Sequence, residues 1–560
     1  MNRLLFFIIL FPLVIFGSVE DRPGFNFESL GQIAIQHRGR IKPLDTFASE
    51  SLQFVTGKKS WKGKGAVECL VGWLFNFDRE WENEEIIRVT YKPLKAEMGL
   101  GDDKNYFSFN QLQDNEGLKR ILKSAATKSR NRERLSDLEK KAVTVENQLG
   151  LIGEIFTGQA FAILPNPEGI SASWYPITNL NTQGGLPYAS DVTERFAITL
   201  KESVEAFLNK NAQGWNASVP RLISMLSEDM AKGSYPEKSV LKREIHYNRL
   251  RPFRVSWGLY TVGFIFLMVF IVGKRKMFQN LGLGAVILGL LVHTYGFTLR
   301  CLIAGRPPVT NMYESVIWVT WGCVLFSLFV WMAYKNSVVP TAATVFSIVG
   351  LVLADNLPFV LDPSINPLEP VLRSNYWLTI HVLTITLSYA AFALSLCLGN
   401  VVMGYYVFRP TSTTHIQNYS LYMYRAMQIG VVLLAAGTIL GGVWADYSWG
   451  RFWGWDPKEV WALIALLFYL AVLHGRFTGW LKGFGFAATT VISFLGVLMA
   501  WYGVNFVLGV GLHSYGFGSG GMGWVSSYVA LQLGFIILGY KNYKKALSSH
   551  SLDTSIFPKS

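Results

Sequence analysis

Nine apolar stretches follow one another in the second half of the chain, and they constrain its fold more than any other feature. They cover 255–273, 278–299, 313–334, 339–355, 376–408, 428–445, 458–475, 483–506 and 523–540. Roughly 20 apolar residues in a helix cross the hydrocarbon layer of a membrane, and the run 376–408 is long enough to project beyond it. The pattern predicts a mainly α, polytopic helical membrane protein with about nine transmembrane helices.

The distribution of charged residues separates a soluble part from the membrane part near residue 254. From Glu20 to Arg254 there are 33 Lys and Arg with 30 Asp and Glu, whereas Val255 to Ser560 has 17 and 8. Most of the net charge of +13 therefore lies in the membrane half, so it does not indicate nucleic-acid binding. We expect an exported α-rich soluble domain over 19–254, a multi-span domain over 255–545 and a cytoplasmic tail over 546–560.

The first 18 residues, MNRLLFFIILFPLVIFGS, have a basic start, a short apolar core and small residues at the end. This pattern fits a secretory signal peptide or an uncleaved N-terminal anchor. Either one would deliver the residues up to Arg254 to the outer side of the membrane.

The exported part has the patterns of a small helical domain. Residues 26–56 mix short strand-like and helical patterns, and 165–191 form a loop rich in Pro, Gly and Asn. Dense charge with one apolar stripe over 111–160 predicts an amphipathic helix or helical hairpin. The stripe consists of Leu118, Ile121, Leu122 and Ala125. Two more helical stretches follow near 192–211 and 219–232, and no catalytic motif stands out.

The basic residues of the membrane half orient the nine spans. With residue 254 outside, twelve Lys and Arg fall on the inner side and five on the outer side, as the positive-inside rule requires. Seven of the eight acidic residues lie at or beyond the outer boundary: Glu314, Asp355, Asp362, Glu369, Asp446, Asp456 and Glu459. The two signals agree, and they place the loop around 444–461 outside.

That loop contains WGRFWGWDPKE (449–459), which concentrates indole rings beside a helix start. Asp456 fits an N-cap, with Pro457 at the first helical position and Glu459 at the third. Trp461 and Trp444 fit an interfacial aromatic belt. Neither role explains the aromatic residues of the Gly-interrupted loop, which are Trp449, Phe452, Trp453 and Trp455. An apolar plate outside the bilayer needs a partner, and a planar ligand such as a porphyrin complements aromatic faces.

Histidines supply the second clue, because a histidine within a span is functional by default. His381 begins the fifth span and His513 follows the eighth, so both approach the outer boundary at the level of the Trp-rich loop. Two imidazoles across one site are what a hexacoordinate haem iron needs. Each histidine alone has packing or capping as its simpler explanation.

The other histidines and the cysteines carry weaker signals. His474, near the inner end of the seventh span, is an interfacial anchor beside Arg476 or a ligand. His293, in the second span, is a ligand or a hydrogen-bonded interior polar group. His37, His246, His415 and His550 lie in segments expected to be solvated. Four scattered cysteines form no CxxC or CxxCH, so the chain is neither a thiol-redox enzyme of that type nor a c-type cytochrome.

Several of these stretches together resemble a known family. WGRFWGWDPKEVWALI resembles the Trp-rich signature, or WWD domain, of membrane haem-handling proteins. GLHSYGF after it, with RPPVTNMYESVIWVTW and YWLTIHVLTITLSYAAF before it, resembles the CcsA (ResC) family of system II cytochrome c synthases. The resemblance spans most of 290–516 in the same order. The exported QHRGRIKPLDTFA segment is similar to one ahead of the CcsA part in fused CcsBA-type proteins.

The resemblance implies a site and a reaction. His381 and His513 match the two external histidines that ligate haem iron, and His474 matches an intramembrane histidine that helps to carry haem across; the match assigns no such role to His293. Haem b is then a bound substrate resting on Trp449, Trp453 and Trp455, beside Asp456. The expected reaction joins the haem vinyl groups to the CxxCH thiols of an apocytochrome c. The chain would thus be an enzyme as part of a holocytochrome c synthase, or haem lyase, complex.

The resemblance also implies partners and a location. No CcsB-like bundle of spans precedes the exported domain, so a separate CcsB (ResB)-type membrane subunit is expected. Apocytochrome c and thiol-reducing proteins that keep CxxCH reduced would be further partners. The location would be the bacterial cytoplasmic membrane, with the N-terminal domain and the WWD loop on the periplasmic side.

Three other interpretations stay open at this point. A haem b electron-transfer protein would have paired histidines at bilayer depth rather than beside an exposed Trp-rich loop. A haem or small-solute exporter would use the loop only as a gate, without ligation. The haem-delivery proteins of the system I pathway fit nine spans and a large N-terminal exported domain less well.

Overall fold

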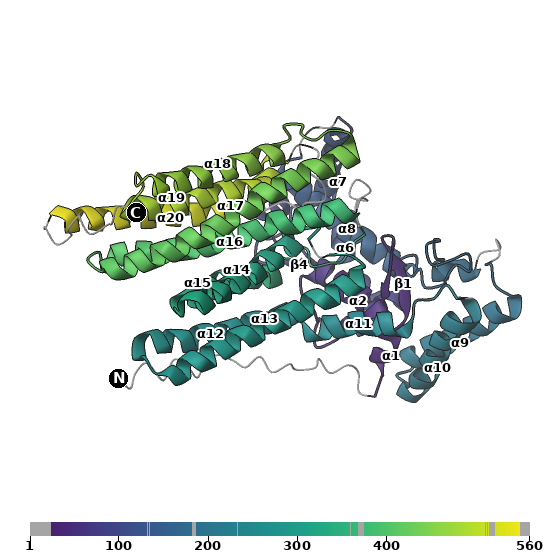
Figure 1. Cartoon of the computed structure of the whole chain (residues 1–560). Helices are drawn as coiled ribbons and strands as arrows, with labels where there is room; N and C mark the ends of the chain where they lie inside the picture. Colours follow the sequence, from purple (N-terminus) through teal and green to yellow (C-terminus); the bar gives the residue numbers. More distant parts are fainter. Residues whose placement is uncertain are drawn as a thin grey trace. The chain divides into compact units, whose positions relative to one another are not determined.

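The structure is a computed structural model that describes residues 24–548 apart from 132, 134, 182–185, 232, 308, 359, 368–374, 510, 512 and 514–520. The predicted signal or anchor over 1–18, most of the predicted tail over 546–560, and His550 lie outside these residues. The chain divides into two compact units, Met1–Asn248 and Arg249–Ser560 (Figure 1).

The first unit is mostly helical with two small hairpins. Its elements are α1 (Phe27–Gly31), β1 (Ala34–His37), β2 (Arg40–Pro43), α2 (Leu44–Thr56), α3 (Ala66–Leu74), α4 (Glu80–Asn83), β3 (Ile87–Arg88), α5 (Lys92–Glu97), β4 (Tyr106–Phe107), α6 (Phe109–Gln113), α7 (Glu116–Arg130), α8 (Asp137–Phe156), the 3-10 helix η1 (Ile177–Asn181), α9 (Ser190–Leu208), α10 (Ala212–Ser224), the π-helical turn η2 (Met225–Met230) and α11 (Lys238–Leu250). β1 pairs antiparallel with β2, Ala34 opposite Pro43, and β3 with β4, Ile87 opposite Phe107.

Helices α7 and α8 form the predicted amphipathic helical hairpin. Leu118, Ile121 and Ala125 of the predicted stripe are buried. Ser136 begins α8 with a capping box, in which its hydroxyl accepts from the backbone N–H of Glu139 and its own N–H donates to the Glu139 carboxylate. This reciprocal pair satisfies two otherwise unpaired N–H groups.

The second unit is a bundle of long apolar helices. They are α12 (Pro252–Gly273), α13 (Lys276–Ala304), α14 (Met312–Tyr334), α15 (Val338–Asn356), α16 (Asn375–Phe408), α17 (Thr413–Trp449), α18 (Pro457–Phe477), α19 (Gly483–Leu498) with the π-helical η4 (Met499–Leu508), and α20 (Met522–Ser548). Among the described residues, nine helical segments are long and apolar enough to span a membrane. The predicted polytopic helical fold is therefore confirmed.

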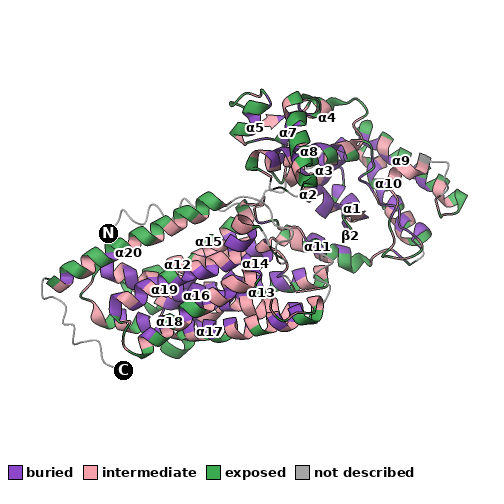
Figure 2. Ribbon diagram, turned by 90° about the horizontal axis from the view of Figure 1, so that it is seen from above, coloured by how far each residue is buried: buried purple, intermediate pink, exposed green. Residues whose placement is uncertain are grey.

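Small residues let the central pair of helices approach closely. A Cβ at Gly430 of α17 would lie 2.5 Å from the Phe392 ring of α16, and one at Gly437 would lie 2.9 Å from the backbone of Ile385. Small residues at helix interfaces are the usual device of membrane bundles, because dispersion contacts depend on close approach. Figure 2 shows many buried residues on the packed helices of this bundle, whereas Gly539 and Ala546 are the buried residues of α20.

One helix is much longer than the apolar stretch that predicted it. The sequence predicts a span over 428–445, whereas α17 begins at Thr413 and ends at Trp449. Its first four turns carry polar residues on one side and bury Ile416, Tyr419 and Met423 on the other. An apolar-run criterion finds only the part of a helix that is apolar on all sides, so this amphipathic part was missed.

Candidate functional site

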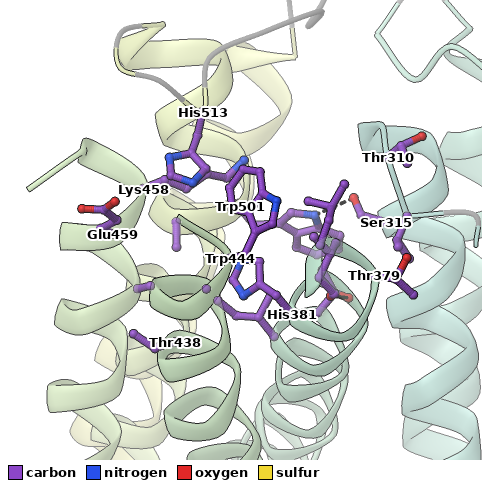
Figure 3. Close-up of a pocket in the computed structure, with 18 of the residues that line it drawn as sticks. Thr310, Ser315, Thr379, His381, Thr438, Trp444, Lys458, Glu459, Trp501 and His513 are labelled. Atoms are coloured by element: carbon purple, nitrogen blue, oxygen red, sulfur yellow. Dashed lines mark hydrogen bonds between the residues drawn. The ribbon is translucent and has the colours of Figure 1, made fainter. Parts of the chain in front are cut away.

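A large pocket lies within the second unit, at the end of the bundle where α16 and α18 begin and α17 and η4 end (Figure 3). Its empty volume, including the part open to solvent, is about 1290 Å³. Its aromatic lining consists of Tyr389, Trp444, Phe452, Trp453 and Trp501. Two histidines, His381 and His513, also line it, so the structure brings together the two that the sequence singled out.

His381 presents one ring nitrogen to this pocket. It lies in the second turn of α16, and its Nδ1 is 2.7 Å from the carbonyl oxygen of Gly437 on α17. A carbonyl oxygen can only accept, so Nδ1 carries the proton and donates it. Nε2 therefore bears the lone pair. Among the described residues no hydrogen bond engages it, which is the state of a histidine ready to ligate a metal.

Two glycines of α17 make room for this imidazole. A Cβ at Gly441 would lie 2.5 Å from Cε1 of His381, and the same glycine borders the pocket. A Cβ at Gly442 would lie 2.5 Å from the ring of Phe452. Side chains at these positions would displace both rings, so the glycines define the shape of the pocket.

His513 is held in the same way by a different acceptor. Its Nδ1 lies 2.9 Å from Oδ1 of Asp456, and its side chain is 14% exposed. Gly511, with φ +101°, brings the backbone so close that a Cβ there would lie 2.4 Å from the other carboxylate oxygen of Asp456. A carboxylate that accepts from Nδ1 fixes the tautomer and makes Nε2 the available, more basic nitrogen.

Asp456 also begins helix α18, as predicted. Its carboxylate accepts from the backbone N–H of Lys458, Pro457 stands in the first turn, and the Glu459 carboxylate accepts from the backbone N–H of Asp456. The predicted capping box is confirmed. The buried carboxylate of Asp456 thus has two tasks, since it also orients His513.

Trp444 lies between the two histidines in Figure 3. Its ring is parallel to that of His381, with centroids 6.3 Å apart, and its centroid is 5.9 Å from that of His513. Only 1% of this residue is exposed. The belt interpretation of Trp444 is therefore wrong, because a belt residue faces lipid and headgroups.

The three tryptophans predicted to form one plate have different surroundings. Trp449 is the last residue of α17 rather than part of the loop, and its ring meets that of His513 edge to face at 5.1 Å. Trp453 lines the pocket. Trp455 is 71% exposed, has φ +57°, and packs edge to face on Trp453 at 6.0 Å. Of the three, Trp453 alone borders the pocket.

The remaining candidate histidines lie away from this pocket. His293 is fully buried and stacks on Phe297. Its Nδ1 forms a hydrogen bond of 3.2 Å with the Tyr260 hydroxyl. This environment is that of a hydrogen-bonded interior polar group. His474 is exposed near the opposite end of α18, and its Nδ1 donates to the carbonyl of Leu470. Among the described residues, no hydrogen bond engages its Nε2.

Sequence reasoning missed three polar or aromatic residues of the lining. Trp501 of η4 donates its indole N–H to the Ser315 hydroxyl of α14, 2.8 Å away. Lys458 donates from Nζ to Oδ1 of Asn505 at 3.0 Å. Arg306, beyond the end of α13, also lines the pocket. The available signal for the two cations was a charge at the end of an apolar run, but the sequence analysis uses Lys458 and Arg306 only in the count of charges on each side of the membrane.

Comparison with known proteins defines the class to which this fold and site belong. A family model described as "Cytochrome C assembly protein" matches residues 309–513, the stretch that contains His381, the Trp-rich loop and His513. The chain is 36% identical over 272 residues to the cytochrome c biogenesis protein CcsA of a Prochlorococcus marinus strain, covering 86% of that protein and 43% of this chain. This chain belongs to the CcsA family of cytochrome c assembly proteins, and a role in cytochrome c biogenesis follows.

A longer relative extends the similarity into the first unit. Protein NrfI of Wolinella succinogenes is 30% identical over 515 residues, which cover 89% of this chain and 55% of NrfI. The chain therefore spans about half the length of that relative. A solved structure of the cytochrome c haem lyase CcmF covers 54% of this chain with 14% identity and a TM-score of 0.38, a likeness too distant to bear on the site.

Proposed function

We propose that this chain binds haem b in the His381 pocket, with His381 and His513 as axial ligands, and presents it for attachment to apocytochrome c. The observation that supports the proposal is that the two imidazoles have the same hydrogen-bonding arrangement. They come from separate parts of the chain and line one pocket, and each has its Nδ1 engaged by an acceptor. Two neutral imidazoles with available Nε2 atoms are a donor set that suits haem iron.

The lining fits a flat, mostly apolar macrocycle. Phe452, Trp453 and Trp501 offer aromatic surface, and indole rings stack well on extended π systems. Trp444 has its ring about 6 Å from each histidine ring. One iron held by both imidazoles therefore requires the Trp444 indole to leave the place between them and to pack against the macrocycle.

The proposed reaction is the addition of two thiols to two vinyl groups. Each cysteine S–H of CxxCH adds across a vinyl C=C, so that one S–C bond and one C–H bond form and no electrons are exchanged with an outside reagent. The chain contributes position, since fixing haem and peptide together makes a bimolecular step effectively intramolecular. It also sets the axial ligands and the polarity around the haem.

The proposed setting is the bacterial cytoplasmic membrane with a CcsB-type subunit. The positive-inside count supports a periplasmic location for the His381 pocket and for the first unit. Because the chain belongs to the CcsA family, we propose that a CcsB (ResB)-type membrane subunit acts with it. Apocytochrome c and proteins that keep its thiols reduced complete the proposed set of partners. His474, an exposed residue whose Nδ1 donates to the Leu470 carbonyl, is the proposed intramembrane ligand on the route of haem across the membrane.

Co-expression with a CcsB-type subunit and a CxxCH apocytochrome tests the proposal. We expect covalent haem staining of the acceptor, and its loss in the variants His381→Ala and His513→Ala. The matched control is His415→Ala, at the start of α17 and outside the pocket lining. Haem exported without any thioether product would favour the exporter alternative, and a reversible redox couple without product would favour the electron-transfer alternative.

A further inference from the structure

The carboxylate of Glu459 has more partners than the start of a helix requires. It lines the His381 pocket, and 10% of the side chain is exposed. In the capping box of α18, its Oε2 accepts from the backbone N–H of Asp456 at 3.1 Å. The same oxygen accepts from the N–H of Gly454 at 2.8 Å. A capping box needs only the first of these bonds, so the second one acts on the loop between α17 and α18, residues 450–456.

The two bonds enclose Trp455. This residue has φ +57°, a left-handed conformation that is unfavourable for a bulky side chain and persists only where neighbouring contacts hold it. Here the amides on both sides of Trp455 donate to one carboxylate oxygen. Its indole meets that of Trp453 edge to face, with ring centroids 6.0 Å apart. Glu459 therefore fixes the backbone from which both indoles project.

Arg451 ties the beginning of the loop to the same carboxylate. Its Nη1 donates to Oε1 of Glu459 at 3.4 Å, the oxygen that the two amides do not use. The guanidinium also covers Gly454, where a Cβ would lie 1.4 Å from Nη1, and it lies over the Trp449 ring, 5.5 Å from the centroid. One carboxylate thus accepts hydrogen bonds from the beginning, the middle and the end of the loop.

We propose, on the basis of the proposed haem-binding function, that Glu459 is a positioning residue that holds the α17–α18 loop in its haem-binding form before haem arrives. Glu459 acts through Trp453, the indole of this loop that lines the pocket. A surface that is already ordered loses less entropy on binding, so the affinity is higher. His381 and His513 have acceptors of their own. Loss of the Glu459 carboxylate should therefore weaken haem binding, while the haem that does bind keeps a low-spin spectrum.

Hydrogen exchange of the full chain without haem tests the hold on the loop directly. A backbone amide exchanges slowly while its hydrogen bond is intact. Exchange over 450–456 should be about tenfold faster in Glu459→Ala than in the wild type, because two charge-assisted bonds are lost. In Glu459→Gln, whose amide oxygen still accepts, exchange should rise by no more than about threefold. Helix α15 of the same unit should exchange equally in all three proteins, which excludes general unfolding.

Haem titration of the same proteins tests the consequence for binding. Glu459→Ala should bind haem roughly tenfold more weakly than the wild type, and Glu459→Gln should stay within about threefold of it. The matched control is Gln111→Ala, which removes the equivalent capping-box side chain from α6 in the first unit. That variant should keep the wild-type haem affinity, because its capping box supports no part of the pocket.

The two measurements separate the proposal from the function on which it rests. Equal exchange over 450–456 in Glu459→Ala and the wild type would overturn the proposal. Faster exchange with unchanged haem affinity would overturn it as well, and would leave Glu459 as a helix-capping residue. A wild type without a low-spin haem spectrum that depends on His381 and His513 would instead contradict the proposed function, whatever the exchange shows. Should Glu459→Ala not accumulate, Glu459→Asp, which keeps the charge but is one methylene shorter, should show both effects.

Discussion

Asp456 holds His513 and starts helix α18 with the same carboxylate oxygen. Its Oδ1 lies 2.9 Å from Nδ1 of His513 and 3.0 Å from the backbone nitrogen of Lys458. One buried oxygen atom therefore both orients the candidate ligand His513 and caps the start of helix α18. The two tasks can be separated chemically, because the helix start needs an acceptor oxygen whereas the imidazole gains from a negative charge.

We expect Asp456→Asn to weaken haem binding by about 10- to 100-fold, the usual cost of losing a carboxylate behind a ligating histidine. Helix α18 should persist, since Asn caps helices as well as Asp does. Haem titration and thermal unfolding in detergent measure the two effects. Asp456→Ala should show the same weaker binding together with about 1 kcal/mol lower stability. Wild-type haem affinity in Asp456→Asn would show that the His513 contact has no role in binding.

Gly441→Ala should abolish the paired-imidazole spectrum. The new Cβ would lie 2.5 Å from Cε1 of His381, so the ring must turn away from its present position. Gly404→Ala is the matched control, because a Cβ at that position of α16 has no neighbour within 4 Å. Visible spectra of the two purified variants give the comparison, and a wild-type spectrum in Gly441→Ala would contradict the assigned place of His381.

Trp453→Ala should reduce haem retention during purification by roughly tenfold, since it removes an aromatic surface of the pocket. Insertion into the membrane should be unchanged. Trp480→Ala is the control, as that indole is 81% exposed beyond the other end of α18. The ratio of haem to protein after purification measures retention. Full retention in Trp453→Ala would exclude the Trp453 indole as a haem-binding surface.

The sequence predicts the helices of the second unit well because apolar runs of this length have one stable outcome in a membrane. It also predicts the start of α18, since Asp456, Pro457 and Glu459 form a local signal that distant contacts do not alter. The pocket lining was harder to predict. Trp444 and Trp501 lie on helices whose faces are apolar all round, so periodicity does not distinguish an indole that faces a pocket from one that faces lipid.

Long-range contacts explain the other features of the site that the sequence does not predict. The acceptors of His381 and His513 are Gly437 and Asp456, 56 and 57 positions away, and no spacing rule connects them. The sequence predicts Trp449 in a Gly-interrupted loop after a span that ends at 445, whereas α17 continues to Trp449 and Gly450, with φ +69°, is its left-handed C-cap. A glycine after a helical run indicates either a loop or a helix end.

Acid should destabilise the first unit through His37, which the sequence predicts to be solvated but which is partly buried in the structure. Burial lowers the pKa of this imidazole from 6.5 to about 4, and the charges of Lys42 and Arg38 add to the effect. The unfolded chain then binds a proton below pH 6.5 that the folded chain does not. Stability from this group is complete above that pH and is lost as the pH falls toward 4. The loss should be about 1–3 kcal/mol. Thermal unfolding of the full chain at pH 7.5 and pH 5 should differ less in His37→Gln than in the wild type; an identical pH dependence would contradict this.

The visible absorption spectrum of the purified protein, with and without a CcsB-type subunit, tests the central claim most directly. The proposal predicts protoporphyrin haem with a low-spin spectrum of two imidazole ligands, and loss of that spectrum when His381→Ala and His513→Ala are combined. Variants at His293 should keep it, because that residue lies away from the pocket. An unchanged low-spin spectrum in the double variant would contradict the assignment of these two histidines as the ligands of one iron.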